Sequence, residues 1–121
     1  MAIVGLDHVQ LSAPAGSEQA ARRFFRDVLG LAEVEKPAAL RRRGGVWFAL
    51  ETGQQLHIGV EESHAPARKA HPALVVNDLD ALAARLDGAG ALVEWDDSLP
   101  DVRRFYTADP WGNRIELIAA G

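Results

Sequence analysis

Four side chains able to bind a metal ion occur in two pairs along the chain, one pair in each half. His8 and His57 belong to the first half, and His71 and Glu116 belong to the second. His57 and Glu116 are each flanked by apolar residues that must point to the opposite face of a strand, because strand side chains alternate with a period of two. The four polar side chains are therefore expected on the face of each sheet opposite to the face that carries the apolar residues.

Three imidazoles and one carboxylate form a nitrogen and oxygen donor set without thiolates. This set suits one divalent ion of zinc, nickel, iron(II), cobalt or manganese, and not a thiolate-bound structural zinc. Four protein ligands on an octahedral ion leave two adjacent positions for water or for a substrate that binds through two oxygens. Such a site favours polarisation of a carbonyl group and stabilisation of an enolate, with metal-bound water or a loosened carboxylate moving the proton.

The competing interpretation of these histidines is structural. A single histidine in a strand is more often a hydrogen-bonded or half-exposed residue than a metal ligand. Here three of the four histidines fall on corresponding positions of the two halves, and Glu116 completes the set, which favours the metal site. The fourth histidine, His64, lies in the polar segment EESHAPARK and is expected to be solvated.

Hydrophobic periodicity predicts a strand, a helix and three strands in the first half. Residues 3–13 alternate as in a half-buried strand, and Ser17 is a good N-cap for a helix that ends at Gly30. The apolar residues of that helix, at helical spacing, are Ala21, Phe24, Phe25 and Val28. Proline and glycine breaks then delimit three short strands, expected near residues 38–43, 46–51 and 55–60.

The second half repeats this order. A strand over 71–76 precedes a helix that Asn77 or Asp78 can cap and that Gly88 and Gly90 end. Its apolar residues are Leu79, Leu82, Ala83 and Leu86, and the three strands that follow are expected near 91–95, 103–108 and 113–119. His8 and His71 have the same separation along the chain as Ser17 and Asp80, which supports an internal repeat. We therefore predict an α+β fold of two βαβββ modules, residues 1–61 and 71–121, joined by a linker over 62–70.

Aromatic and arginine side chains admit both structural and functional interpretations. Phe48 and Phe105 are expected in the core, whereas Trp47 and Tyr106 occupy corresponding points of the two halves and are predicted to line a substrate cavity. The basic runs, Arg41-Arg42-Arg43 and Arg103-Arg104, are expected at solvated strand edges. The alternative is recognition of a substrate carboxylate or phosphate by an arginine.

Composition limits the classes of function. A length of 121 residues fits one domain or two small halves, and 48% hydrophobic with 25% charged residues is typical of a globular chain. The net charge of −4 argues against nucleic acid and anionic membranes as partners. The sequence contains no cysteine, and no signal peptide or membrane span is expected, so we predict a cytoplasmic protein.

Five segments of the sequence resemble the vicinal oxygen chelate superfamily, which includes glyoxalase I, bleomycin-resistance proteins, fosfomycin-resistance thiol transferases, methylmalonyl-CoA epimerase and extradiol dioxygenases. They are LDHVQL at 6–11, RRFFRDVLGLAEV at 22–34, QLHIGV at 55–60, HPALVVNDLDALAARLDGAG at 71–90 and DPWGNRIEL at 109–117. The last is the most specific, because Asp109-Pro110-Trp111-Gly112 suits a type I turn in a hairpin that delivers Glu116. The resemblance implies curved sheets around a metal cavity, and commonly a homodimer whose site lies within one chain or between two.

The family's metal positions correspond to His8, His57, His71 and Glu116, the set already derived from the residues. His57 departs from the pattern that the resemblance implies. At this position glyoxalase I of the bacterial type is expected to have a glutamate, and the epimerases a glutamine. Glu116 is then the remaining candidate for the catalytic carboxylate.

Three functions are compatible with these residues. The first is a metal-dependent isomerase, lyase or epimerase of the glyoxalase-like group, acting on a small oxygenated molecule. The second is a metal-free ligand-binding protein of the bleomycin-resistance kind. The third is an iron(II) dioxygenase using His8, His71 and Glu116, ranked lower because His57 would occupy a position that oxygen or substrate needs. Fosfomycin-type transferases use the same three positions, but the potassium-loop sequence expected in them is not evident.

Overall fold

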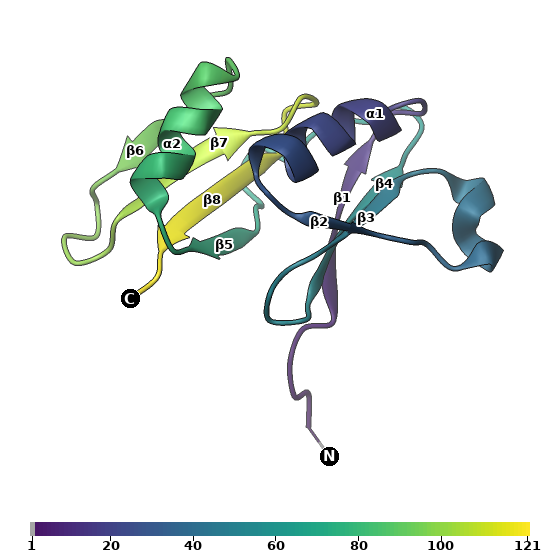
Figure 1. Ribbon diagram of the computed structural model, residues 1–121, viewed down its shortest axis with the longest axis horizontal. Coiled ribbons are helices and arrows are strands. Elements are labelled where there is room, and N and C mark those ends of the chain that lie inside the picture. Colours follow the sequence, from purple (N-terminus) through teal and green to yellow (C-terminus); the bar gives the residue numbers. More distant parts are fainter. Residues whose placement is uncertain (1) are drawn as a thin grey trace. The chain divides into compact units, whose positions relative to one another are not determined.

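The computed structural model describes residues 2–121 and divides the chain into two compact units, 1–64 and 65–121. Each unit contains one four-stranded mixed sheet and a helical segment after its first strand (Figure 1). The elements of the first unit are β1 (His8–Ala13), α1 (Glu18–Ala21), η1 (Arg22–Val28), β2 (Ala32–Val34), η2 (Ala38–Arg43), β3 (Val46–Ala49) and β4 (Gln55–Val60). Those of the second are β5 (Ala73–Val76), α2 (Leu79–Gly88), β6 (Glu94–Asp96), β7 (Arg104–Ala108) and β8 (Arg114–Ala119).

The two sheets have the same topology. Their strand orders are β1-β4-β3-β2 and β5-β8-β7-β6, with the first and last strands of each unit parallel and the other pairs antiparallel. A parallel pair needs a long crossover connection, which the helical segment and two further strands provide. The predicted α+β fold of two βαβββ modules is confirmed.

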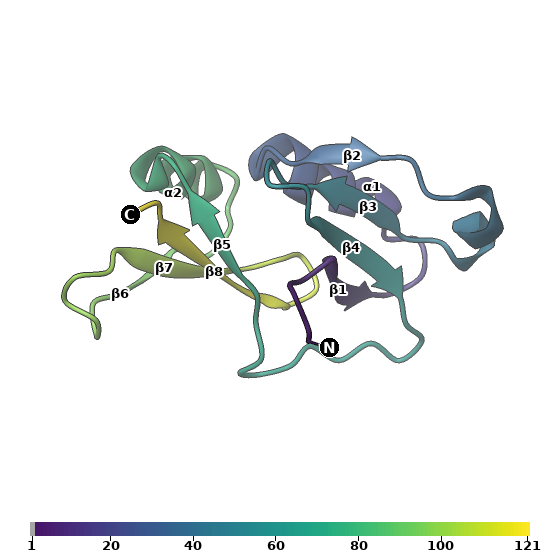
Figure 2. The same cartoon turned by 90° about the horizontal axis from the view of Figure 1, so that it is seen from below.

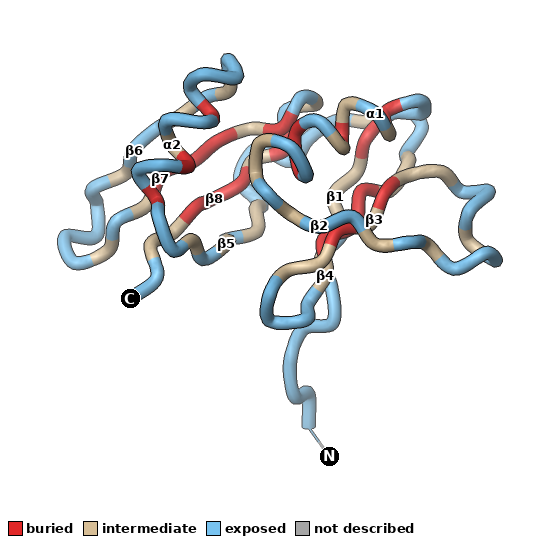
Figure 3. The backbone as a smooth tube through the Cα atoms, in the orientation of Figure 1, coloured by how far each residue is buried: buried red, intermediate tan, exposed pale blue. Residues whose placement is uncertain are grey.

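A hydrophobic core lies in each unit between the helical segment and one face of the sheet (Figures 2 and 3). In the first unit the rings of Phe25 and Phe48 pack 5.6 Å apart, and both are fully buried. In the second unit Phe105 is fully buried, as are Leu86 of α2 and Leu117 of β8. Phe48 and Phe105 thus have the core positions predicted for them.

The first helix differs from a regular α-helix. After the single turn of α1, residues Arg22–Val28 form a π-helix, in which the amide of Leu29 donates to the carbonyl of Phe24. The neighbouring residues Phe24 and Phe25 are both buried, and Gly30 ends the segment with φ 81°, as its position predicted.

The strand predicted over 38–43 is wrong. This segment is the 3₁₀-helix η2, and the strand of this part of the sheet is β2, which directly follows Gly30 and Leu31. The physical reason is composition: alanine, leucine and arginine favour helical conformations, and the segment has no β-branched residue to favour a strand. None of the helices within residues 2–121 is long and apolar enough to cross a membrane.

The two predicted helix caps differ in the structure. The Asp78 carboxylate accepts a hydrogen bond from the amide of Ala81, 3.1 Å away, and so caps α2. Ser17 precedes α1, but its side chain makes no capping bond, and its buried hydroxyl oxygen has no hydrogen-bond partner among residues 2–121.

We therefore predict that Asp78→Ala lowers the free energy of unfolding of the second unit by about 1 kcal/mol, because the helix loses a cap. Ser17→Ala, the matched change at the other helix, should cost less than about 0.5 kcal/mol because no hydrogen bond is lost. Urea titration followed by NMR amide signals of each unit measures both values. Equal losses in the two variants would contradict this account of the caps.

Candidate functional site

Parallel pairing of the first and last strands places the predicted ligands of each unit side by side. In the first unit Gln10 of β1 pairs with His57 of β4, and His8 lies two residues before Gln10, on the same face of the strand. In the second unit Ala73 pairs with Glu116 of β8, and His71 precedes Ala73 by the same two residues. The four residues thus form two pairs, His8 with His57 and His71 with Glu116.

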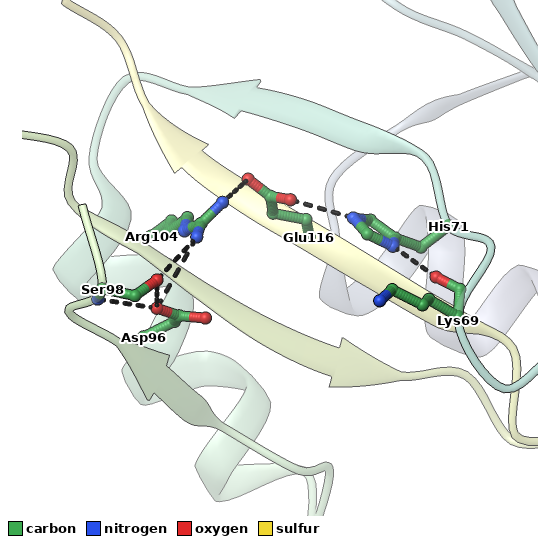
Figure 4. Close-up of polar contacts among 6 residues, drawn as sticks. All are labelled: Lys69, His71, Asp96, Ser98, Arg104 and Glu116. Atoms are coloured by element: carbon green, nitrogen blue, oxygen red, sulfur yellow. Dashed lines mark hydrogen bonds and ion pairs between the residues drawn. The ribbon is translucent and has the colours of Figure 1, made fainter.

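His71 and Glu116 are in direct contact. The Nε2 atom of His71 lies 2.9 Å from Oε1 of Glu116, and its Nδ1 atom lies 2.8 Å from the backbone oxygen of Lys69 (Figure 4). A carbonyl oxygen only accepts, so Nδ1 of His71 carries a proton and donates it to Lys69. Oε1 of Glu116 is a carboxylate oxygen and accepts from the Nε2 side of the same ring.

The second oxygen of Glu116 is held separately. Nη1 of Arg104 donates to Oε2 across 3.4 Å, while Nη2 of Arg104 donates to the Ser98 hydroxyl and lies 3.6 Å from Asp96 (Figure 4). Glu116 is only 6% exposed. Burial by itself would raise the pKa of Glu116, but the hydrogen bonds from His71 and Arg104 and their charges outweigh it, so the pKa lies below its ordinary value.

The first unit holds its pair in a different way. The ring of His57 is stacked between the Trp47 indole, 3.8 Å away between centroids, and the His8 ring, 4.2 Å away. Nε2 of His57 donates to the Gln55 side-chain oxygen, and Nδ1 of His8 donates to Asp7, each across 2.8 Å. His57 is 4% exposed, whereas the side chain of His8 is 43% exposed.

Burial is the largest cause of a lowered pKa at His57. The positive charge that His8 carries when protonated lowers it further, Asp7 opposes the shift, and Lys36 adds to it. His57 is therefore a neutral imidazole at neutral pH, stacked on aromatic rings.

The two pairs differ in how well they fit a metal ion. Two ligands bound at right angles at about 2.1 Å from one ion lie about 3 Å apart, close to the separation of the His71 and Glu116 atoms. The bond from His71 to the Lys69 carbonyl is also the kind of contact that fixes the ring of a metal-bound histidine. This pair fits a divalent ion.

His8 and His57 do not fit one ion as they are placed. A metal binds an imidazole nitrogen within the plane of the ring, and these planes are stacked with only 17° between them. Ligation by both would require one ring to rotate, and the exposed His8 is the freer of the two. Among residues 2–121, no group of three or more histidine, aspartate or glutamate side chains is arranged to hold a metal within either unit.

Trp47 and Tyr106 occupy the equivalent positions expected of them. Trp47 of β3 pairs with His57, and Tyr106 of β7 pairs with Glu116, at corresponding points of the two sheets. The Tyr106 ring also meets His71 edge-on, 5.2 Å away between centroids. Both aromatic residues thus contact a candidate metal ligand.

His64 is not solvated as expected. Its side chain is 7% exposed, and the contact that the structure shows for it is with Glu61, 3.8 Å away. The expectation of a solvated His64 is therefore wrong.

Arg104 is the site residue that the sequence interpretation assigned to a solvated edge. Arg104 precedes Tyr106 by two residues on β7, and Tyr106 pairs with Glu116, so Arg104 and Glu116 lie on the same face of the sheet. The alternation of strand residues could have predicted this from the sequence. The neighbouring Arg103 behaves as expected of an edge residue and binds Asp80 through two hydrogen bonds.

Comparison with known proteins gives one family and several structures. The family described as "Glyoxalase-like domain" matches residues 10–118. A Bacillus anthracis protein described as a glyoxalase family protein is 45% identical, with a TM-score of 0.94, and the match covers 100% of this chain and 98% of that one. No curated protein matches the sequence.

Two further structures share the fold at lower identity. A glyoxalase/dioxygenase from Nostoc punctiforme is 22% identical, with a TM-score of 0.80 and coverage of 97% of this chain and 91% of that one. A lactoylglutathione lyase from Agrobacterium tumefaciens is 24% identical, with a TM-score of 0.71 and coverage of 96% and 93%.

We predict that the pKa of His57 lies below 6.5 and rises towards 6.5 in Trp47→Ala, because that change exposes the ring. The unfolded chain then binds the proton more tightly than the folded one. As far as His57 is concerned, the free energy of unfolding is therefore at its full value above about pH 6.5 and decreases as the pH falls below that value. NMR titration of the His57 ring measures the pKa, and a value at or above 6.5 in the unmodified protein would refute the assignment.

Arg104→Gln should raise the pKa of Glu116, because burial remains while a neighbouring cation is lost. Arg103→Gln removes the same charge one residue away and should leave that pKa unchanged, since Arg103 pairs with Asp80. Carbon-13 NMR of the Glu116 carboxyl during a pH titration measures both. If the two variants behave alike, Arg104 does not hold Glu116.

Proposed function

The chain belongs to the glyoxalase-like domain family of the vicinal oxygen chelate superfamily, and from this premise we propose that it is a metal-dependent enzyme. Its substrate would be a small oxygenated molecule, and its reaction an isomerisation, lyase or epimerase step. The observation that carries the proposal is the contact of His71 with Glu116, which has the spacing of two ligands of one ion.

The proposed ligands are His71 through Nε2, Glu116 through Oε1, and the imidazoles of the first unit. Of these, His8 has its Nδ1 atom bound to Asp7 and would bind through Nε2, while His57 would have to leave its stack. The site would form either within one chain or from two chains of a homodimer. Assembly as a homodimer and a cytoplasmic location are parts of this proposal.

A divalent ion bound by these residues would act as a Lewis acid that polarises a substrate carbonyl and stabilises the negative charge formed next to it. The protein supplies the remaining steps. Lys69 holds His71 in the tautomer that presents Nε2, and Arg104 holds Oε2 of Glu116 so that Oε1 is presented. The pKa of Glu116 is held below its ordinary value, so its carboxylate is ionised at neutral pH and would be the group that takes up the proton lost by the substrate.

The position of His57 also supports a second candidate, an iron(II) dioxygenase. The objection to this chemistry was a fourth ligand at His57, and the stack between Trp47 and His8 leaves that residue outside a three-ligand set of His8, His71 and Glu116. Oxygen consumption with catechols under iron(II) tests this candidate. Metal-free ligand binding, the third candidate, predicts ligands that raise the melting temperature in the presence of chelator.

The proposal predicts about one divalent ion per chain after loading with zinc, nickel, iron(II), cobalt or manganese. His71→Ala and Glu116→Gln should each lower metal affinity by about tenfold or more and reduce turnover, because each removes a ligand. Glu51→Gln, the matched change at an exposed turn, should alter neither. Elemental analysis after dialysis, together with competition by a chelating dye, measures occupancy and affinity.

Full metal occupancy in both His71→Ala and Glu116→Gln would place the ion elsewhere. Failure of all five ions to bind the unmodified protein would instead favour ligand binding without metal.

A further inference from the structure

A pocket of about 290 Å³ opens in the second unit, and Tyr106 and Arg114 are among its lining residues. Its walls come from the segment before β5, from β6 and β7, and from the turn and strand of β8. Tyr106 connects the pocket to the pair, because its ring lines the pocket and also meets His71 edge-on. A pocket of this volume suits a small organic molecule.

Two arginines line this pocket without a carboxylate partner. Arg68 and Arg114 form no ion pair with any residue in the described range 2–121, which is also true of the exposed Arg23, Arg42 and Arg43; what distinguishes Arg68 and Arg114 is that they line this pocket. Glu94 also lines the pocket, but neither arginine lies within ion-pair distance of it. The chain therefore leaves both guanidinium charges unneutralised.

Arg114 is held in place by an aromatic ring. Its guanidinium carbon lies 3.8 Å from the centroid of the Tyr106 ring, the closest cation–π contact in residues 2–121. Stacking fixes the plane of a guanidinium group and leaves the N–H donors along its edge available to a ligand. Such donors match the paired oxygens of a carboxylate, phosphate or phosphonate.

We propose that Arg114, stacked on Tyr106 and assisted by Arg68, binds an oxyanion group of the substrate while the oxygenated end of the same molecule reaches His71 and Glu116. The binding of the oxyanion by Arg114 rests on the pocket alone. The contact of the same molecule with His71 and Glu116 rests on the proposed function. The substrate class inferred from the pocket is a small metabolite that carries a carboxylate or phosphate-type group.

The arrangement has a consequence for specificity. Tyr106 contacts both Arg114 and His71, so one aromatic ring separates the anion-binding group from the candidate metal ligand. Substrates long enough to span this ring gain a charge-assisted hydrogen bond, while neutral analogues leave Arg114 without a partner. The basic run Arg41-Arg42-Arg43 is not needed for this recognition, since Arg41 already pairs with Glu35.

The first part of the test uses the metal-free protein in the presence of chelator. Methylphosphonate, acetate and the neutral acetamide are titrated while the Nε–H signal of Arg114 is followed by NMR. We expect saturable shifts with the two anions and none with acetamide, and the stronger anion identifies the preferred source of the oxyanion. Arg114→Gln should weaken anion binding by about tenfold or more.

Three further variants guard against a merely structural effect. Arg68→Gln lies in an exposed segment and should weaken anion binding without unfolding the unit, and Arg114→Lys should recover only part of the affinity. Arg23→Gln, which removes the same charge from an exposed position of the first unit, should change nothing. Equal anion affinity in Arg114→Gln and in the unmodified protein would overturn the proposal, as would equal binding of acetate and acetamide.

The second part uses the zinc-loaded protein and three hydroxamates, which bind metals through two oxygens. Acetohydroxamate is neutral at its far end, malonic monohydroxamate carries a carboxylate, and phosphonoacetohydroxamate carries a phosphonate. The anionic probes should bind about tenfold or more tightly than acetohydroxamate, and Arg114→Gln should remove this advantage while leaving the acetohydroxamate affinity and the zinc content unchanged.

The two parts separate the possible failures. Absence of zinc and acetohydroxamate binding contradicts the proposed function, and the first part still decides whether the arginine pocket binds oxyanions. Binding of acetohydroxamate with no advantage for the anionic probes contradicts this inference and leaves the proposed function intact.

Discussion

Parallel pairing of the first and last strands of each unit is the constraint on which both candidate pairs depend. His8 and His57 are 49 residues apart in the sequence and His71 and Glu116 are 45 apart, yet the pairing of β1 with β4 and of β5 with β8 places them on neighbouring strands. The crossover of helix and antiparallel strands that this pairing requires also buries one face of each sheet. The other face receives the polar side chains, because strand residues alternate.

The same backbone arrangement produces two chemically different pairs. In the second unit a carboxylate at position 116 meets an imidazole and a guanidinium, so the contact is ionic and holds each oxygen of Glu116 against a different partner. In the first unit the corresponding position is His57, and an imidazole there stacks on Trp47 and His8. The carboxylate at position 116 thus makes hydrogen bonds to an imidazole and a guanidinium, whereas the ring at position 57 lies in an aromatic stack.

Much of the fold was predictable from the sequence, because it depends on local rules. Alternation and helical spacing identified both βαβββ modules and the core positions of Phe48 and Phe105, and residue type limited the cap of the second helix to Asn77 or Asp78, of which the structure uses Asp78. The prediction of a strand over 38–43 was wrong, because the alanine, leucine and arginine residues of this segment favour a helix. The residues around the pairs were harder to predict, since the roles of Arg104, Arg114 and His64 depend on register, on rotamers and on which side chains become buried.

The central claim is that His71 and Glu116 bind one divalent ion through Nε2 and Oε1. Anomalous diffraction from crystals loaded with manganese or zinc, collected on both sides of the metal absorption edge, tests it most directly. The account predicts a single anomalous peak about 2.1 Å from each of these two atoms, with Arg104 still in contact with Oε2 of Glu116. A fully occupied peak elsewhere in the chain, with no peak within bonding distance of these two atoms, would contradict it.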